Sequence, residues 1–167
     1  IESIREPNPV VFFADLMLLG KKGDVPEGAY SIEFGKADVK REGTDVTVVA
    51  IGSTVPQALE VADQLAETGV SVEVIDPRTL VPFDWDAVAK SVSKTGRLVA
   101  VDPNRETCGA ASEIITQAVE RCWSQLKAQP QRVTWPNVPM PYSPPLEKAV
   151  VSDLDDIRRA IELTLKS

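Results

Sequence analysis

Histidine, the side chain used most often for acid–base catalysis near neutral pH, does not occur among the 167 residues of this chain. Ser-His-Asp and Cys-His catalysis therefore cannot be assembled from its residues alone. The two cysteines and the carboxylates do not cluster at the spacings typical of a zinc site. We expect no catalytic residue, no cofactor-binding residue and no metal ligand within this chain.

Three segments that follow expected strands could direct the backbone N–H groups of a helix start toward an anion. They read "IGST" (51–54), "DPRT" (76–79) and "DPNRETCG" (102–109). Their spacing matches neither GxGxxG nor GxxxxGK(S/T), so it gives no support to nucleotide binding. The simpler alternative is that small residues make tight strand-to-helix turns here. The candidate anion-binding or interface positions are Gly52, Ser53, Thr107, Cys108 and Gly109.

Asp76 and Asp102 each end an expected strand, as do the paired acids of a magnesium-binding phosphoacceptor domain. Each is followed by proline, however, which favours an extended residue entering a turn. We therefore prefer the turn interpretation to a magnesium site. Arg78 and Arg105 are the expected ion-pair partners of these two carboxylates.

The cysteines and tryptophans have chemical and structural interpretations. Cys108 is expected near a helix N-terminus, where a thiol could be activated, but with no base available we prefer a packed thiol. Cys122 has no neighbouring cysteine pair and is expected to be a small buried residue. Trp85, Trp123 and Trp135 are too widely spaced for base stacking, and are expected to anchor packing or an interface.

The charge balance bears on the possible partners. Eighteen basic and 25 acidic residues give a net charge of −7, which argues against nucleic-acid binding and favours basic partners. No apolar run approaches the roughly 20 residues needed to cross a bilayer, so no membrane contact is expected. The chain begins at Ile1 in what reads as mid-helix, which suggests a piece of a longer protein.

Apolar periodicity predicts the elements that would position these residues. Near-continuous apolar runs are typical of strands buried on both faces, and occur at residues 45–51, 70–75, 97–101 and 132–135. Three- and four-residue spacing or capping signals predict helices at residues 55–66, 85–92, 108–126 and 152–165. Ser53 or Thr54 is expected to cap the first of these, and Ser152 with Asp155 has capping-box spacing at the last.

The remaining segments are predicted to be irregular or extended. A helix end before Pro7, a short apolar strand at 10–13 and one or two extended pieces within 30–41 are expected. Five prolines in residues 136–145 predict an extended, non-helical segment. The fold class is then α/β, a three-layer α/β/α arrangement with a mostly parallel sheet of about five strands. Residues 1–30 form an irregular N-terminal segment, and residues 31–167 the domain.

Six motifs occur in one order through most of the chain: "PNPVVFF", "VPEGAYSIEFGKADVKREGTDVTVVAIGS", "GVSVEVIDPRTLVPFD", "SVSKTGRLVAVD", "TCGAASEI" and "VPMPYSPPLE". Together they resemble the transketolase-like C-terminal domain of beta subunits from 2-oxoacid or acetoin dehydrogenase decarboxylating components. Where many relatives have a His or aromatic residue in the loop after the third core strand, this chain reads "VDPNRETCG", which is nearer the acetoin-type members.

The resemblance implies that the complete protein is a thiamine-diphosphate-dependent oxidoreductase component of a multienzyme complex. It would decarboxylate pyruvate or a branched-chain 2-oxoacid, or cleave acetoin, and pass the acyl group to lipoamide. The activating glutamate would lie in a preceding pyrimidine-binding domain, linked through residues 1–30. The alpha subunit would hold the cofactor's diphosphate through magnesium. The location would be the bacterial cytoplasm or, in a eukaryote, the mitochondrial matrix.

The same resemblance implies an assembly role for this chain. It would associate with the alpha subunit and a second beta subunit, and dock the peripheral subunit-binding domain of the acyltransferase core. Alone it would bind no cofactor and have no turnover. Two alternatives stay open: a domain of a transketolase or deoxyxylulose-phosphate synthase type enzyme, and a freestanding flavodoxin-like binding module with magnesium or phosphate affinity near Asp76 and Asp102.

Overall fold

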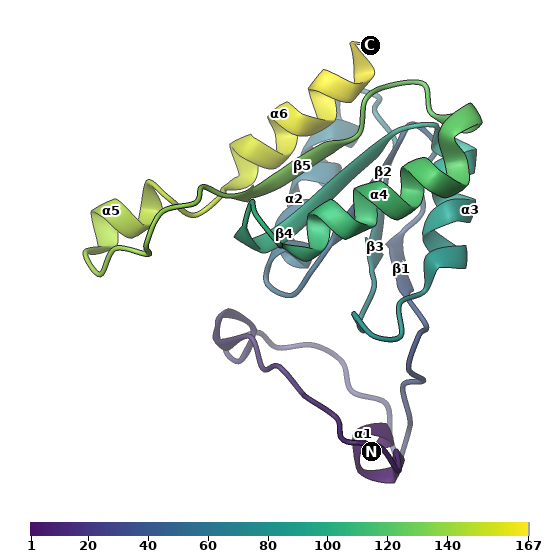
Figure 1. Cartoon of the computed structure of the whole chain (residues 1–167), viewed down its shortest axis with the longest axis vertical. Helices are drawn as coiled ribbons and strands as arrows, with labels where there is room; N and C mark the ends of the chain where they lie inside the picture. The colour runs from purple at the N-terminus through teal and green to yellow at the C-terminus, as the bar shows by residue number, and fades with distance from the viewer. Residues whose placement is uncertain (167) are drawn as a thin grey trace.

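A five-stranded sheet with the order β1-β3-β2-β4-β5 organises the chain, and β1 alone runs antiparallel to its neighbour (Figure 1). The computed structural model describes residues 1–166. The strands are β1 (Asp38–Arg41), β2 (Val46–Ala50), β3 (Val72–Asp76), β4 (Leu98–Arg105) and β5 (Gln131–Trp135). The helices with their 3-10 turns are α1 (Glu2–Arg5), η1 (Leu16–Leu18), α2 (Thr54–Ala66), α3 (Trp85–Thr95), α4 (Ala110–Cys122), η2 (Trp123–Gln125), α5 (Pro144–Lys148) and α6 (Leu154–Leu165).

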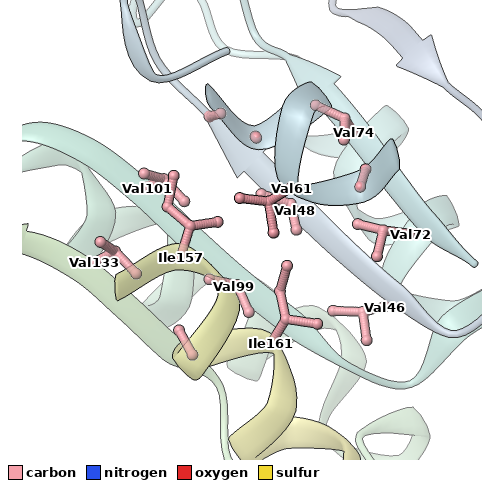
Figure 2. Packing of buried hydrophobic residues seen from close by; sticks show 14 of the residues in the cluster. Val46, Val48, Val61, Val72, Val74, Val99, Val101, Val133, Ile157 and Ile161 are labelled. Atoms are coloured by element: carbon pink, nitrogen blue, oxygen red, sulfur yellow. The ribbon is translucent and has the colours of Figure 1, made fainter. Parts of the chain in front are cut away.

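Helices cover both faces of the sheet, as predicted. Helices α2 and α6 pack on one face, and α3 and α4 pack on the other. All five residues of β2 are buried, because successive side chains point to opposite covered faces. Figure 2 shows the first core, where Val61 of α2 and Ile157 and Ile161 of α6 meet a layer of strand valines. The expected three-layer α/β/α fold is confirmed.

Two expected element boundaries are wrong for reasons of local chemistry. Strand β4 extends beyond residue 101 to Arg105, with its register shifted between Val101 and Arg105 so that Pro103 falls in the irregular part. The proline-rich segment does contain a helix, because Pro144 and Pro145 occupy the first turn of α5. Proline is tolerated there, since a first-turn N–H has no intrahelical acceptor to lose.

The predicted cap of the last helix is displaced by one residue. Asp153, not Ser152, is the N-cap of α6: its carboxylate accepts hydrogen bonds from the amides of Asp155 and Asp156, at 2.9 and 3.1 Å. Asp156 completes the capping box by accepting from the Asp153 amide at 3.2 Å. The Ser152 hydroxyl instead donates to the Thr134 carbonyl at 3.1 Å, which ties the start of α6 to β5.

Residues 1–34, here called the N-terminal arm, extend away from the sheet and its helices (Figure 1). None of these residues is buried, and the strand expected at 10–13 is absent because no neighbouring strand pairs with that segment. Helix α1 ends before Pro7 as predicted. Among residues 1–166, no helix is long and apolar enough to cross a membrane.

Candidate site at the carboxyl end of the sheet

The carboxyl ends of β2 and β4 lie side by side, because these two parallel strands are direct neighbours. The chain leaves β2 for α2 on one face of the sheet, and leaves β4 for α4 on the other. The strand order therefore reverses between β2 and β4. In open α/β sheets such a reversal opens the crevice in which ligands bind. The sequence-predicted positions Gly52, Ser53, Thr107, Cys108 and Gly109 all fall on the two loops at this reversal.

The loop after β2 carries a carboxylate from the N-terminal arm. The amide of Ser53 donates a hydrogen bond of 2.7 Å to Asp15 Oδ2, and the amide of Met17 donates one of 3.0 Å to Asp15 Oδ1. Burial raises the pKa of the Asp15 carboxyl, but the hydrogen bonds from Ser53 and Met17 outweigh burial and hold this pKa below its usual value. A carboxylate thus lies where the sequence predicts an anion.

Neither of the predicted side-chain caps of α2 forms. The Ser53 side chain makes no capping bond, and the Thr54 hydroxyl donates to the Ile51 carbonyl at 2.8 Å. The carboxylate at this helix start is Asp15, 38 positions away, which accepts from the amide of the N-cap residue Ser53 itself. Sequence reasoning missed Asp15 because periodicity describes near neighbours only. The available signal was a lone acid inside the apolar stretch "VVFFADLMLL".

Asp102 caps the other helix at this edge. Its side chain is buried, and Oδ2 accepts a hydrogen bond of 3.1 Å from the Ala111 amide in the first turn of α4. Gly109 leaves no room for a side chain, since a Cβ there would lie 2.6 Å from the Arg105 carbonyl oxygen and 2.8 Å from Asp102 Oδ2. Only glycine lets the loop approach the carboxylate this closely.

Asp76, Arg78 and Arg105 do not form the ion pairs expected from the sequence, and each has another partner. Asp76 Oδ1 accepts from the Arg78 amide at 2.9 Å, so the turn interpretation is confirmed for this residue. The Arg78 guanidinium pairs with Asp38 at 2.5 Å, and Arg105 Nε donates to the Val138 carbonyl at 3.3 Å. The expected Asp76–Arg78 and Asp102–Arg105 side-chain pairs are therefore wrong. Residues 1–166 contain no group of three or more acidic or cysteine side chains that could hold a metal ion.

Thr107 and Cys108 complete the loop after β4. The Thr107 amide donates to Asn137 Oδ1 at 3.2 Å, and Asn137 Nδ2 donates to the Thr107 hydroxyl at 2.7 Å. Cys108 has a left-handed backbone (φ 62°) and an exposed side chain, so the packed-thiol expectation is wrong for it. The expectation is confirmed for Cys122, which is buried under α3.

Large exposed apolar side chains concentrate outside this edge, on the N-terminal arm and on the segment from β5 to α6. On the arm they include Val11, Phe12, Phe13, Leu16, Met17 and Leu19. After β5 they include Val138, Met140, Tyr142 and Leu146. Trp123 is 73% exposed, whereas Trp85 stacks on Phe83 with ring centroids 4.0 Å apart. Contiguous exposed apolar surface is typical of protein interfaces.

The end of the sheet where we expected a ligand is therefore occupied by side chains of the chain itself, two carboxylates and one asparagine amide. Asp15 and Asp102 are hydrogen-bonded at the starts of α2 and α4, and Asn137 engages Thr107. The magnesium and phosphate affinity expected of a flavodoxin-like module near Asp76 and Asp102 gains no support from this donor set.

Comparisons with known proteins agree with this architecture. Residues 35–157 match the family described as transketolase, C-terminal domain. The chain is 42% identical over 166 residues to the acetoin:2,6-dichlorophenolindophenol oxidoreductase subunit beta of Cupriavidus necator, covering 99% of this chain and 49% of that protein. It is 40% identical over 144 residues to the pyruvate dehydrogenase E1 component subunit beta of Bacillus subtilis, covering 86% of this chain and 44% of that protein.

A solved structure described as a split gene transketolase, inactive beta4 tetramer, is similar with a TM-score of 0.68 and 26% sequence identity, over 86% of this chain and 46% of that one. The chain spans about half the length of the curated relatives it matches. The resemblance to beta subunits of acetoin and 2-oxoacid dehydrogenases is confirmed. The chain belongs to the transketolase C-terminal domain family.

Proposed function

We propose that this chain is the C-terminal assembly domain of the beta subunit of a thiamine-diphosphate-dependent dehydrogenase component acting on acetoin or a 2-oxoacid. The observation that carries the proposal is the edge of the sheet at β2 and β4. Its helix starts are already engaged by Asp15 and Asp102, while apolar side chains gather on two exposed segments. This distribution suits a domain that binds other subunits rather than a small substrate.

The complete enzyme would bind thiamine diphosphate and magnesium, with this chain supplying no ligand to either. The donor set supports this proposal, because the carboxylates at the expected edge are engaged in capping and turn hydrogen bonds. The partners would be an alpha subunit, a second beta subunit and the peripheral subunit-binding domain of the acyltransferase core. A net charge of −7 favours a basic docking domain. The location would be the bacterial cytoplasm or the mitochondrial matrix.

Isothermal titration calorimetry tests whether this chain binds a protein partner rather than the cofactor. The chain is titrated first with thiamine diphosphate and magnesium, then with a peripheral subunit-binding domain. We expect heat of binding only from the second titration. Cofactor binding tighter than about 1 mM by this chain would overturn the assembly role.

Sedimentation tests self-association, for which Trp123 is the reference residue because its side chain is exposed. If two chains pair through a patch that includes this tryptophan, Trp123→Ala should weaken the pair by about ten-fold or more. Trp85→Phe is a matched control, since that ring already stacks on Phe83 within one chain. An unchanged dimer in the Trp123 variant would place the interface elsewhere.

A further inference from the structure

The N-terminal arm is joined to the rest of the structure at one polar contact. Within residues 1–166, the polar contact between residues 1–34 and the residues that follow is made by Asp15 and Ser53, whose amide donates a hydrogen bond of 2.7 Å to Asp15 Oδ2. A second bond, from the Ser31 hydroxyl to the Glu2 carboxylate, closes the arm on itself. No arm residue is buried, so hydrophobic packing on the domain does not explain how the arm is held.

The contact has the chemistry of a strong helix cap. Asp15 brings a full negative charge to the N-terminus of α2, a helix of 13 residues, where unsatisfied amides concentrate positive potential. Among the residues that the structure describes, Asp15 has no ion-pair partner that would compete for its oxygens. Asp24, an exposed acid that follows η1 on the arm, has no hydrogen bond to the start of α2.

The loop after β2 is shaped to admit this carboxylate. Gly52 has a left-handed backbone (φ 56°), and a Cβ at this position would lie 2.9 Å from Asp15 Oδ2. Any larger residue would therefore be strained and would also push against the carboxylate. The Ser53 amide, 2.7 Å from the same oxygen, is thereby left open to the arm.

We propose that Asp15 is a latch that positions the N-terminal arm across the carboxyl end of β2, and that the arm detaches as a unit when this contact is lost. The latch is a property of the chain itself and does not depend on the proposed thiamine-dependent function. Its consequence is that one carboxylate decides where the apolar surface of residues 10–19 is presented.

Hydrogen exchange at a single amide tests the latch directly. In the wild-type chain the Ser53 amide should be protected, and in Asp15→Ala its exchange should quicken about five-fold, the effect typical of losing an N-cap. Trypsin cleavage after Lys21 and Lys22 should rise by a similar factor, because the released arm is more easily bound by the protease. Asp24→Ala removes the same charge from the same arm and should change neither rate.

Two further variants separate the latch from general destabilisation. Gly52→Ala should release the arm without altering Asp15, and combining it with Asp15→Ala should add little, because both remove one contact. Circular dichroism should show the core strands and helices intact in every variant. Unchanged Ser53 exchange in Asp15→Ala would overturn the proposal, as would equal effects of Asp15→Ala and Asp24→Ala, which would show that only net charge matters.

Discussion

The carboxylate of Glu73, on β3, accepts a hydrogen bond from the ammonium group of Lys94 in the last turn of α3. This contact lies near the amino end of the parallel strands, whereas the Asp15 contact lies at their carboxyl end. The Glu73 side chain is 3% exposed and also accepts from the Gly43 amide at 3.2 Å. Lys94 is half-exposed and reaches a second acid, Glu42, at 3.0 Å. The ion pair therefore links the last turn of α3 to β3 through the buried carboxylate of Glu73.

Replacing Lys94 by methionine should destabilise the fold. Glu73 would remain buried without its cation, and we expect a loss of about 1–3 kcal/mol in the free energy of unfolding, less than for a fully buried pair because water screens Lys94. Urea unfolding measures this. Lys90→Met, an exposed lysine on the same helix, is the control and should stay within about 0.5 kcal/mol of the wild type. Equal losses in both variants would contradict the assigned role of Lys94.

Stability should fall in acid through Glu73. Burial raises the pKa of this carboxyl, but hydrogen bonds from Lys94, Ser91 and the Gly43 amide outweigh burial and hold the pKa below its usual value. A group with a lowered folded-state pKa stabilises the fold above its unfolded pKa, and this contribution disappears as the pH falls through the folded value. Glu73→Gln should therefore flatten the loss of stability below about pH 4.5.

The comparison needs urea unfolding of the wild type and of Glu73→Gln between neutral pH and about pH 3. Asp86→Asn is a suitable control, because this exposed acid lies on α3 and should leave the acid limb unchanged. Parallel curves for the wild type and Glu73→Gln would show that Glu73 does not govern the acid response.

A buried hydroxyl cluster lies beside this pair. Thr47 Oγ1, on β2, lies 2.6 Å from Ser91 Oγ and 2.8 Å from Thr95 Oγ1 on α3. Thr47→Val keeps the shape but leaves two hydroxyls with fewer partners, which should cost about 1–2 kcal/mol of unfolding free energy. Thermal unfolding measures it, with the exposed Thr44→Val as control. A neutral Thr47→Val would show that Ser91 and Thr95 satisfy each other without it.

Gly109→Ala should destabilise α4 and its strand. The added methyl group would meet the Arg105 carbonyl oxygen and the Asp102 carboxylate, so the loop must move and weaken the cap at Ala111. We expect a loss of about 1–3 kcal/mol, measured by urea unfolding. Gly20→Ala, where a Cβ meets nothing within 4 Å, should be close to neutral. A tolerated Gly109→Ala would mean that the loop can relax without disturbing Asp102.

The sequence was informative wherever burial alone decides structure. The apolar runs of β2, β3 and β4 and the stripe of α2 identified the layers, because each buries a face that its own residues define. Edge strand β1 was less distinct, since its middle residues Val39 and Lys40 are exposed. The periodicity of apolar residues does not indicate which charged side chains meet. The sequence therefore suggests Asp76 as the ion-pair partner of Arg78, whereas the partner in the structure is Asp38.

The sequence predicted where the candidate site lies, but not which side chains occupy it. Small residues and strand ends located the loops at Gly52 and Gly109, because turn chemistry is local. The side chains that fill those loops come from elsewhere: Asp15 from the arm and Asn137 from beyond β5. Residues 10–13 show the converse, where strand-like composition produces no strand because no neighbour is available to pair with it.

The boundaries of the family match do not coincide with a physical unit. A chain cut to residues 35–157 would lack Asp15, which accepts from the Ser53 amide at the start of α2, and would end α6 before Ile161, which is fully buried against the sheet. The similarity to the Cupriavidus necator beta subunit, by contrast, extends over 166 residues and so includes both the arm and the end of α6. Any dissection of this domain should keep the helix after residue 157 and the arm before residue 35 together with the sheet.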